Sequence, residues 1–148
     1  MDLEEKLYRE GLSVASFGKR VYAYTIDELL ISMIIIIAFY NQIDFENDKL
    51  FDVINMLNSF ILYFFILKTT YHTIFIHLYG KTIGKMVARI KAVDIDLLDN
   101  PSWGKSFLRA VFRNFDEMFF GLGMWFALTN PFLQTIHDKI SKVIVIND

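Results

Sequence analysis

The sequence has no cysteine, only two prolines and seven glycines in 148 residues, and no surplus of charge of one sign. The absence of cysteine excludes disulfide frameworks, thiol catalysis and cysteine-based metal sites. A net charge of −2 gives no overall basic field, so we expect no nucleic-acid partner. The length suits one domain, residues 1–148, and leaves little room for two.

Apolar residues are abundant: 54% of the chain is hydrophobic, 16% is aromatic, and there are 15 phenylalanines. A soluble domain of this size would have to hide too much apolar surface, so the composition predicts the lipid bilayer as solvent. Two segments, residues 21–40 and 53–78, are long enough to cross the bilayer, since 20 residues at ~1.5 Å each reach ~30 Å.

Residues 1–19 lack the apolar core of a signal peptide. Near-helical spacing of Leu3, Leu7, Leu12 and Val14 favours a short amphipathic helix on the membrane surface; a partly ordered polar tail is the alternative.

A third apolar segment, residues 107–133, is interrupted by charges and by helix-weakening residues: Arg109, Arg113, Asp116, Glu117, Gly121, Gly123 and Pro131. At its start, Lys105, Arg109 and Arg113 are spaced by four. We expect an interfacial helix there, with a basic stripe on anionic headgroups.

Basic residues are distributed unevenly among the connections. The acidic stretch after the first segment has one, the tail before it has four, and residues 80–113 have seven. The N-terminus and the connector 80–106 are therefore expected on the cytoplasmic side, and the acidic loop outside.

Two stretches, "ARIKAVDIDL" and "SKVIVIND", alternate like strands. If they pair, the tail 137–148 is cytoplasmic too, and the third segment must enter and return with a bend near Gly121–Gly123; a single crossing is the alternative.

These features predict an all-α integral membrane protein with two firm transmembrane helices, a third bent or re-entrant apolar helical segment and a small cytoplasmic pair of β-strands. Three or so helices cannot easily shield a polar pathway from lipid, so we expect a homo-oligomer.

Two acids, Asp27 and Glu28, interrupt the first segment. An ionised acid costs ~2.5–3.5 kcal/mol at the centre of a membrane helix, so it needs a partner or must protonate. Lys68 and His72 lie at a matching depth in the second segment and share one helix face. We therefore predict an intramembrane cluster of Asp27 and Glu28 with Lys68 and His72. Such a cluster either binds protons or monovalent cations or merely locks the helices together.

The stretch "GKTIGK" is not a phosphate loop, because its spacing is one residue short and no Ser or Thr follows Lys85. We expect no nucleotide there, but a glycine turn that leaves the membrane with Lys81 and Lys85 on headgroups.

His72 and His77 are five apart and point to different faces, which argues against a metal site. No nucleophile accompanies His137 and Asp138, so we expect no enzyme activity and no cofactor.

Three motifs together resemble the RDD family of bacterial membrane proteins. The first is Arg20 with Asp27 in "KRVYAYTID"; the second is "GKTIGK", with Gly80, Thr82, Gly84 and Lys85; the third is "QTIHD", with Gln134, Thr135, His137 and Asp138, followed by a valine-rich strand. The match covers most of residues 15–147 in order. The resemblance implies a multi-pass protein of the bacterial inner membrane that is suspected of transport, usually of cation/proton exchange. Lys68 and His72 lie outside this pattern.

Our leading hypothesis is a small transporter that exchanges a cation for protons with Asp27 at the site. The competing one is a non-transporting scaffold or accessory protein whose buried charges hold the helices together. Asp138 is expected to pair with Arg20 at the mouth of the first span.

Overall fold

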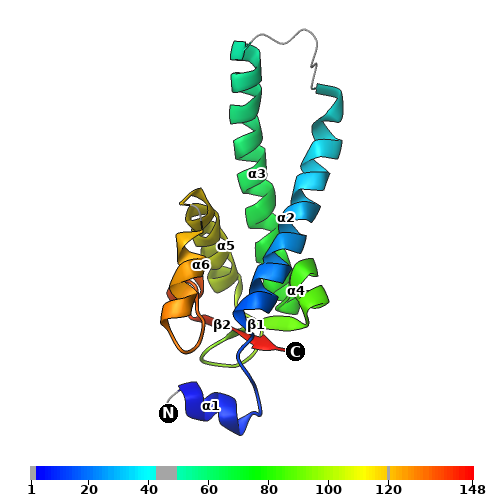
Figure 1. Cartoon of the computed structure of the whole chain (residues 1–148). Helices are drawn as coiled ribbons and strands as arrows, with labels where there is room; N and C mark the ends of the chain where they lie inside the picture. Colours follow the sequence, from blue (N-terminus) through cyan, green and yellow to red (C-terminus); the bar gives the residue numbers. More distant parts are fainter. Residues whose placement is uncertain (1–2, 43–49, 120) are drawn as a thin grey trace.

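The computed structural model describes residues 3–42, 50–119 and 121–148. Two long helices, α2 (Phe17–Phe39) and α3 (Leu50–Tyr79), rise from a base that is formed by the shorter α-helices and the two strands (Figure 1). A short 3-10 turn, η1 (Tyr40–Gln42), follows α2. The acidic loop that the sequence places outside the membrane lies outside the described residues.

Both long helices meet the length and hydropathy expected of membrane spans, over Phe17–Phe39 and Asn58–Tyr79. The two predicted spans therefore exist as helices. Side chains such as Met33, Ile36 and Ile37 on α2 are exposed, as a lipid-facing surface requires. The opposite face of α2 is buried at spacings of three and four residues, as the helical period dictates: Arg20, Ala23, Asp27, Ile31 and Ile35.

The third apolar segment is a helix that bends back. It consists of α5 (Trp103–Met118), α6 (Leu122–Phe126) and the 3-10 turn η2 (Ala127–Thr129). The bend falls at Gly121, whose φ of +68° is costly for any residue with a side chain. It lies where the sequence predicted it.

Helix α5 is polar on its inner face and apolar on its outer face. Arg109 and Arg113 are 3% and 4% exposed, whereas Phe107 and Phe115 are about half exposed. Lys105, the first residue of the expected basic stripe, pairs with Asp94 at 2.6 Å. The prediction of a stripe on headgroups is therefore wrong, because its arginines point into the protein.

The two predicted strands pair. Strand β1 (Ile90–Asp94) runs antiparallel to β2 (Val143–Asn147), with Ala92 opposite Val145. Both faces of this ribbon are covered, which explains why its apolar residues form nearly continuous runs. Residues Ala92 and Val145 share a core with Ala23 of α2, while alternate residues face away from the long helices.

The first helix, α1 (Leu3–Arg9), covers the far face of the ribbon. Its Leu7 is buried in a cluster with Val93, Ile144 and Ile146. The amphipathic helix therefore exists, but its apolar face packs on the strands and not on the membrane surface. Two further short helices carry family motif residues: α4 (Ile83–Ala88) packs against α2 and β1, and α7 (Ile136–Ile140) packs against α5, α6 and β2.

Candidate functional site

Asp27 lies at the contact between α2 and α4 and is fully buried. Its carboxylate accepts hydrogen bonds from the Tyr71 hydroxyl (2.8 Å), the Thr82 hydroxyl (2.6 Å) and the backbone N–H of Gly84 (2.8 Å). Tyr71 in turn accepts a hydrogen bond from the N–H of Ile83. Asp27 therefore satisfies the donors at the start of α4 and joins this helix to α2 and α3.

The predicted four-residue cluster forms only in part. Glu28 contacts Lys68, with 2.6 Å between the carboxylate oxygen and Nζ. Asp27 is engaged by the three donors above, and the described structure gives it no contact with Lys68 or His72. Of the predicted grouping, the Glu28–Lys68 contact is found, whereas the hydrogen bonds of Asp27 go to other residues, since a rotation of ~100° per residue turns the two acids towards different neighbours.

Lys68 is shared between two acids. Its ammonium lies 2.6 Å from Glu28 and 2.5 Å from Glu117 of α5. Arg113 closes the group, at 3.2 Å from Glu117 and 3.7 Å from Glu28. Two acids and two bases thus balance one another where α2, α3 and α5 meet, within the apolar part of the molecule.

This charged group is incompletely hydrogen-bonded. His72 is buried and its Nδ1 lies 3.3 Å from Arg113 Nη1. Asn114 donates to Thr69 at 2.8 Å. Several buried polar atoms of these helices have no hydrogen-bond partner within the described chain: Glu28 Oε1, His72 Nε2, Thr73 Oγ1, Arg113 Nη2 and Asn114 Oδ1. Buried polar atoms are rarely left unsatisfied, so their grouping marks a place suited to water or an ion.

A second charged group surrounds Asp138. Its carboxylate lies 2.7 Å from Arg109 Nε and 3.4 Å from Arg20 Nη1, so the predicted pair with Arg20 exists. Arg20 also donates to four backbone carbonyls, those of Ala15, Phe132, Leu133 and Val145. Burial would raise the pKa of Asp138, but Arg109, His137 and Arg20 outweigh it and hold that pKa well below its usual range.

The remaining motif residues shape this region. Gly80 has a φ of +66°, and a side chain there would collide with Lys91 and Asn100. Gln134 donates to the Val143 carbonyl at 2.9 Å, which ties α7 to β2. His137 Nδ1 lies 3.5 Å from Asp116, and burial lowers its pKa, so the imidazole is neutral at pH 7.

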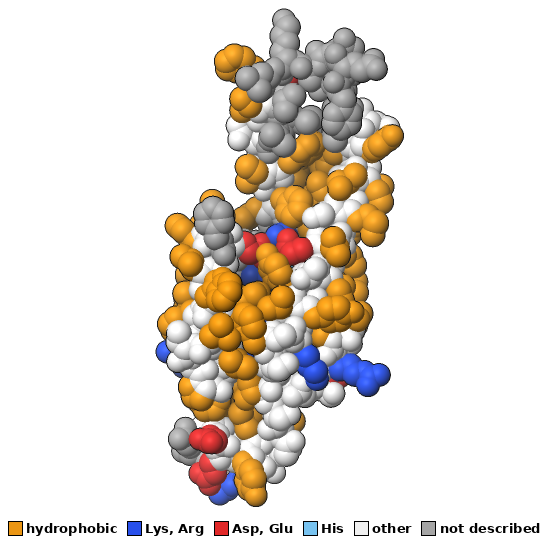
Figure 2. All heavy atoms as spheres, viewed as in Figure 1, with side chains coloured by type: hydrophobic (Ala, Val, Ile, Leu, Met, Phe, Trp, Pro, Cys, Tyr) orange, Lys and Arg blue, Asp and Glu red, His pale blue; other side chains and the backbone are white. Residues whose placement is uncertain are grey.

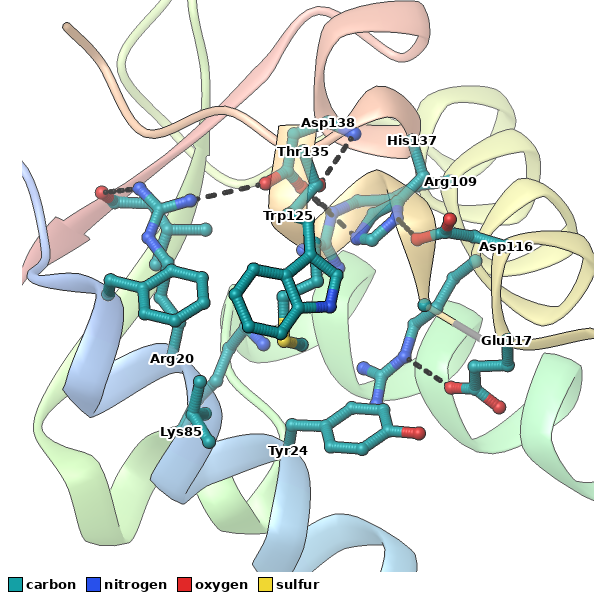
Figure 3. Close-up of a pocket in the computed structure, with 16 residues that line it drawn as sticks. Arg20, Tyr24, Lys85, Arg109, Asp116, Glu117, Trp125, Thr135, His137 and Asp138 are labelled. Carbon is teal, nitrogen blue, oxygen red and sulfur yellow. Dashed lines mark hydrogen bonds and ion pairs between the residues drawn. The ribbon is translucent and has the colours of Figure 1, made fainter. Parts of the chain in front are cut away.

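A cavity of about 480 Å³ connects the two charged groups (Figure 3). Arg20 and Tyr24 come from α2, Lys85 from α4, Arg109 from α5, and Trp125 closes one side from α6. Lys85 is only 6% exposed, and burial followed by the charges of Arg109 and Arg113 lowers its pKa to about 7. The expectation that Lys85 rests on headgroups is therefore wrong.

Three residues of these groups were not predicted as site residues from the sequence, namely Arg109, Arg113 and Glu117. They share one face of α5 with Asn114, at the spacing of a helix. That pattern was visible, but by itself it does not say whether the charged face looks outward to headgroups or inward. Within residues 3–42, 50–119 and 121–148, no group of three or more acidic or histidine side chains is arranged to hold a metal ion.

Exposed apolar helices around a core of paired charges define a small helical membrane protein. The family model described as the RDD family matches residues 14–142, and the chain belongs to this family. Comparison with curated proteins gave no match. Comparison with solved structures gave none either.

Proposed function

We propose that this protein is a non-enzymatic transporter that exchanges a monovalent cation for a proton at Lys68. The observation that carries the proposal is the sharing of one ammonium between the carboxylates of Glu28 and Glu117, at 2.6 and 2.5 Å. A monovalent cation between the same two carboxylates would have the same charge. Glu28 thus takes the role that the sequence suggested for Asp27.

The exchange conserves charge in a poorly solvated place. When Lys68 releases its proton its amine becomes neutral, and one monovalent cation can then replace the ammonium between Glu28 and Glu117. One proton leaves for each cation that enters, so the number of uncompensated buried charges does not change. This matters because an unpaired charge in the hydrocarbon is expensive.

The pattern of exposed side chains supports a place in the bacterial inner membrane, with both termini and the strand ribbon on the cytoplasmic side. The outer face of α5 is apolar and its inner face is charged, and a bilayer favours this arrangement because apolar side chains can face lipid and charged ones cannot. A helix of this kind that returns at Gly121 enters the membrane and leaves on the same side. The basic connections near the ribbon agree with this orientation.

The charges around Lys68 come to the surface within the apolar belt. Figure 2 shows acidic and basic side chains about midway along the molecule, flanked by hydrophobic ones. The side chain of Glu28 is 22% exposed and that of Glu117 is 17% exposed. Because lipid does not solvate charge, we propose that a second copy of the chain covers this opening.

Transport is tested with purified protein in vesicles that contain a pH-sensitive dye. An imposed sodium, lithium or potassium gradient should drive proton flux through the wild type. Glu28→Gln and Lys68→Gln should each slow this flux by about tenfold or more, a barrier change of about 1.4 kcal/mol. Glu10→Gln, on the exposed N-terminal segment, is the matched control and should leave the flux unchanged.

Wild-type flux in Glu28→Gln would contradict the proposal. Folded wild-type protein that moves none of the three cations would favour the other candidate, a scaffold whose charges only hold helices. The hydrogen bonds of Asp27 support the scaffold hypothesis, since they join three helices and occupy the carboxylate that would otherwise bind a transported ion.

A further inference from the structure

The cavity beside α2 has a surplus of positive charge. Each of its three carboxylates already has partners: Asp138 has Arg20 and Arg109, Glu117 has Arg113 and Lys68, and Asp116 has His137 and the N–H of Gly123. Lys85 is the basic residue left over. Its side chain is more than nine-tenths buried, and the described structure gives its Nζ no hydrogen bond and no ion pair. It points into the cavity (Figure 3).

Two arginines beside Lys85 also have spare donors. Arg109 uses Nε on Asp138, and among the described residues no hydrogen bond is found for its two terminal nitrogens. Arg113 uses Nε on Glu117 and Nη1 on His72, while its buried Nη2 lies 3.7 Å from Glu28 Oε1, an ion pair that is longer than a hydrogen bond. Both arginines line the cavity. Lys85 and Arg109 therefore have N–H groups without a hydrogen-bond partner among the described residues, and Arg113 adds positive charge to the same cavity.

Part of the cavity wall is apolar. It includes Tyr24, Met124 and Trp125, and Trp125 is 65% exposed. The space of about 480 Å³ is larger than a single water or monovalent ion needs. Several donors converging from different directions suit a tetrahedral oxyanion, which accepts hydrogen bonds on all of its oxygens.

We propose that this cavity is a binding site for a phosphate group, held by Lys85, Arg109 and Arg113. The phosphate is either inorganic or the headgroup phosphate of an anionic lipid, whose carbon atoms the apolar wall would contact. The site shares Arg113 with the charged group around Lys68, but phosphate binding does not require cation exchange there.

The charge on Lys85 gives the site a pH dependence. Burial, Arg109 and Arg113 lower the pKa of Lys85 to about 7, and Asp27 of α2 and Asp138 of α7 oppose this only in part. The other titratable or charged groups near it are Arg20 and Tyr24 of α2, His72 of α3 and His137 of α7. Protonated Lys85 attracts the anion and the neutral amine does not, so as pH rises through about 7 the wild type should lose affinity relative to a variant with a permanently charged residue at position 85.

The first experiment titrates purified protein with sodium phosphate against sodium chloride of equal ionic strength, followed by tryptophan fluorescence and by thermal unfolding. A parallel titration compares phosphatidylcholine nanodiscs with and without phosphatidylglycerol. Lys85→Gln should weaken binding by about tenfold or more, as expected for a lost charge-assisted hydrogen bond. Lys81→Gln is the matched control, because Lys81 lies on the same turn but pairs with Asp148 at the surface.

A response to inorganic phosphate that Lys85→Gln loses and Lys81→Gln keeps supports the site with a free anion as ligand. The same pattern with phosphatidylglycerol alone supports it with a lipid headgroup. Equal responses of wild type and Lys85→Gln in both titrations, or no response in the wild type, would overturn the proposal.

Lys85→Arg separates charge from folding, because arginine keeps its proton at any pH used. This variant should bind at pH 6 and still bind at pH 8, where the wild type weakens. A decline in Lys85→Arg equal to that of the wild type would count against the site. Phosphate binding is measured without a cation gradient and transport is measured without phosphate, so the two proposals fail independently.

Discussion

Neighbouring residues of α2 have different roles because the helix turns them to different partners. The Asp27 carboxylate accepts three hydrogen bonds, whereas one carboxylate oxygen of Glu28 has no hydrogen-bond partner in the described chain. The sequence predicted that both acids needed partners and grouped them with Lys68 and His72; of these contacts, the one between Glu28 and Lys68 is found. It could not place Asp27, since its donors include the backbone of α4, and backbone donors have no signature in a sequence.

We predict that Asp27→Asn lowers the stability of the protein. An amide has the same shape as the carboxylate, but it accepts fewer hydrogen bonds and has no charge to offer the start of α4. A buried network that loses one acceptor costs about 1–3 kcal/mol in the free energy of unfolding. Thermal and denaturant unfolding in detergent measure the loss, with Glu10→Gln as control. Stability equal to the wild type would show that the network around Asp27 is not needed.

At the scale of elements, the fold depends on a close approach of α4 to α2. A Cβ added to Gly84 would collide with the carbonyl oxygen of Ala23 and would lie 2.9 Å from Asp27 Cγ. This proximity lets the N–H of Gly84 reach the Asp27 carboxylate. The sequence showed a glycine turn here, but the need for Gly84 arises from a neighbour 61 positions away in the chain, 84 minus 23.

We predict that Gly84→Ala destabilises the protein by about 1–3 kcal/mol, the usual cost of forcing an atom into packed space. Gly104→Ala is the matched control, because a Cβ there would meet nothing within 4 Å. It should be neutral or stabilise by about 0.5 kcal/mol, since alanine favours a helix. Unfolding curves of Gly84→Ala and Gly104→Ala measure the two changes in stability. A Gly84→Ala protein as stable as Gly104→Ala would mean that α4 and α2 are not in tight contact.

In the whole molecule, the beginning and the end of the RDD segment are joined. Arg20 binds Asp138 and the carbonyl of Val145, and Val14 bridges Ile146. The ribbon of β1 and β2 requires that the chain return after α5, so the N-terminal segment and the C-terminus lie at one end of the long helices (Figure 1).

The lack of cysteine makes this arrangement simple to test with single-cysteine variants. Ser13→Cys and Asp148→Cys should react with an impermeant maleimide from the same side of sealed membrane vesicles. Asn41→Cys, at the far end of α2, should react only from the other side. The expected reason is that α2 crosses the membrane once between Ser13 and Asn41. Labelling of Ser13→Cys and Asp148→Cys from opposite sides would disprove the return of the chain.

The sequence by itself determined the two apolar helices, the bend near Gly121, the strand pair and the family, because hydropathy, period and turn residues act over short stretches of chain. Only the tertiary structure decided that the arginines of α5 and Lys85 point inward, and that Asp27 caps α4. Helical periodicity tells which residues share a face but not what that face meets. In a membrane protein the charged face turns towards other charges, because lipid cannot replace the water that would otherwise solvate it.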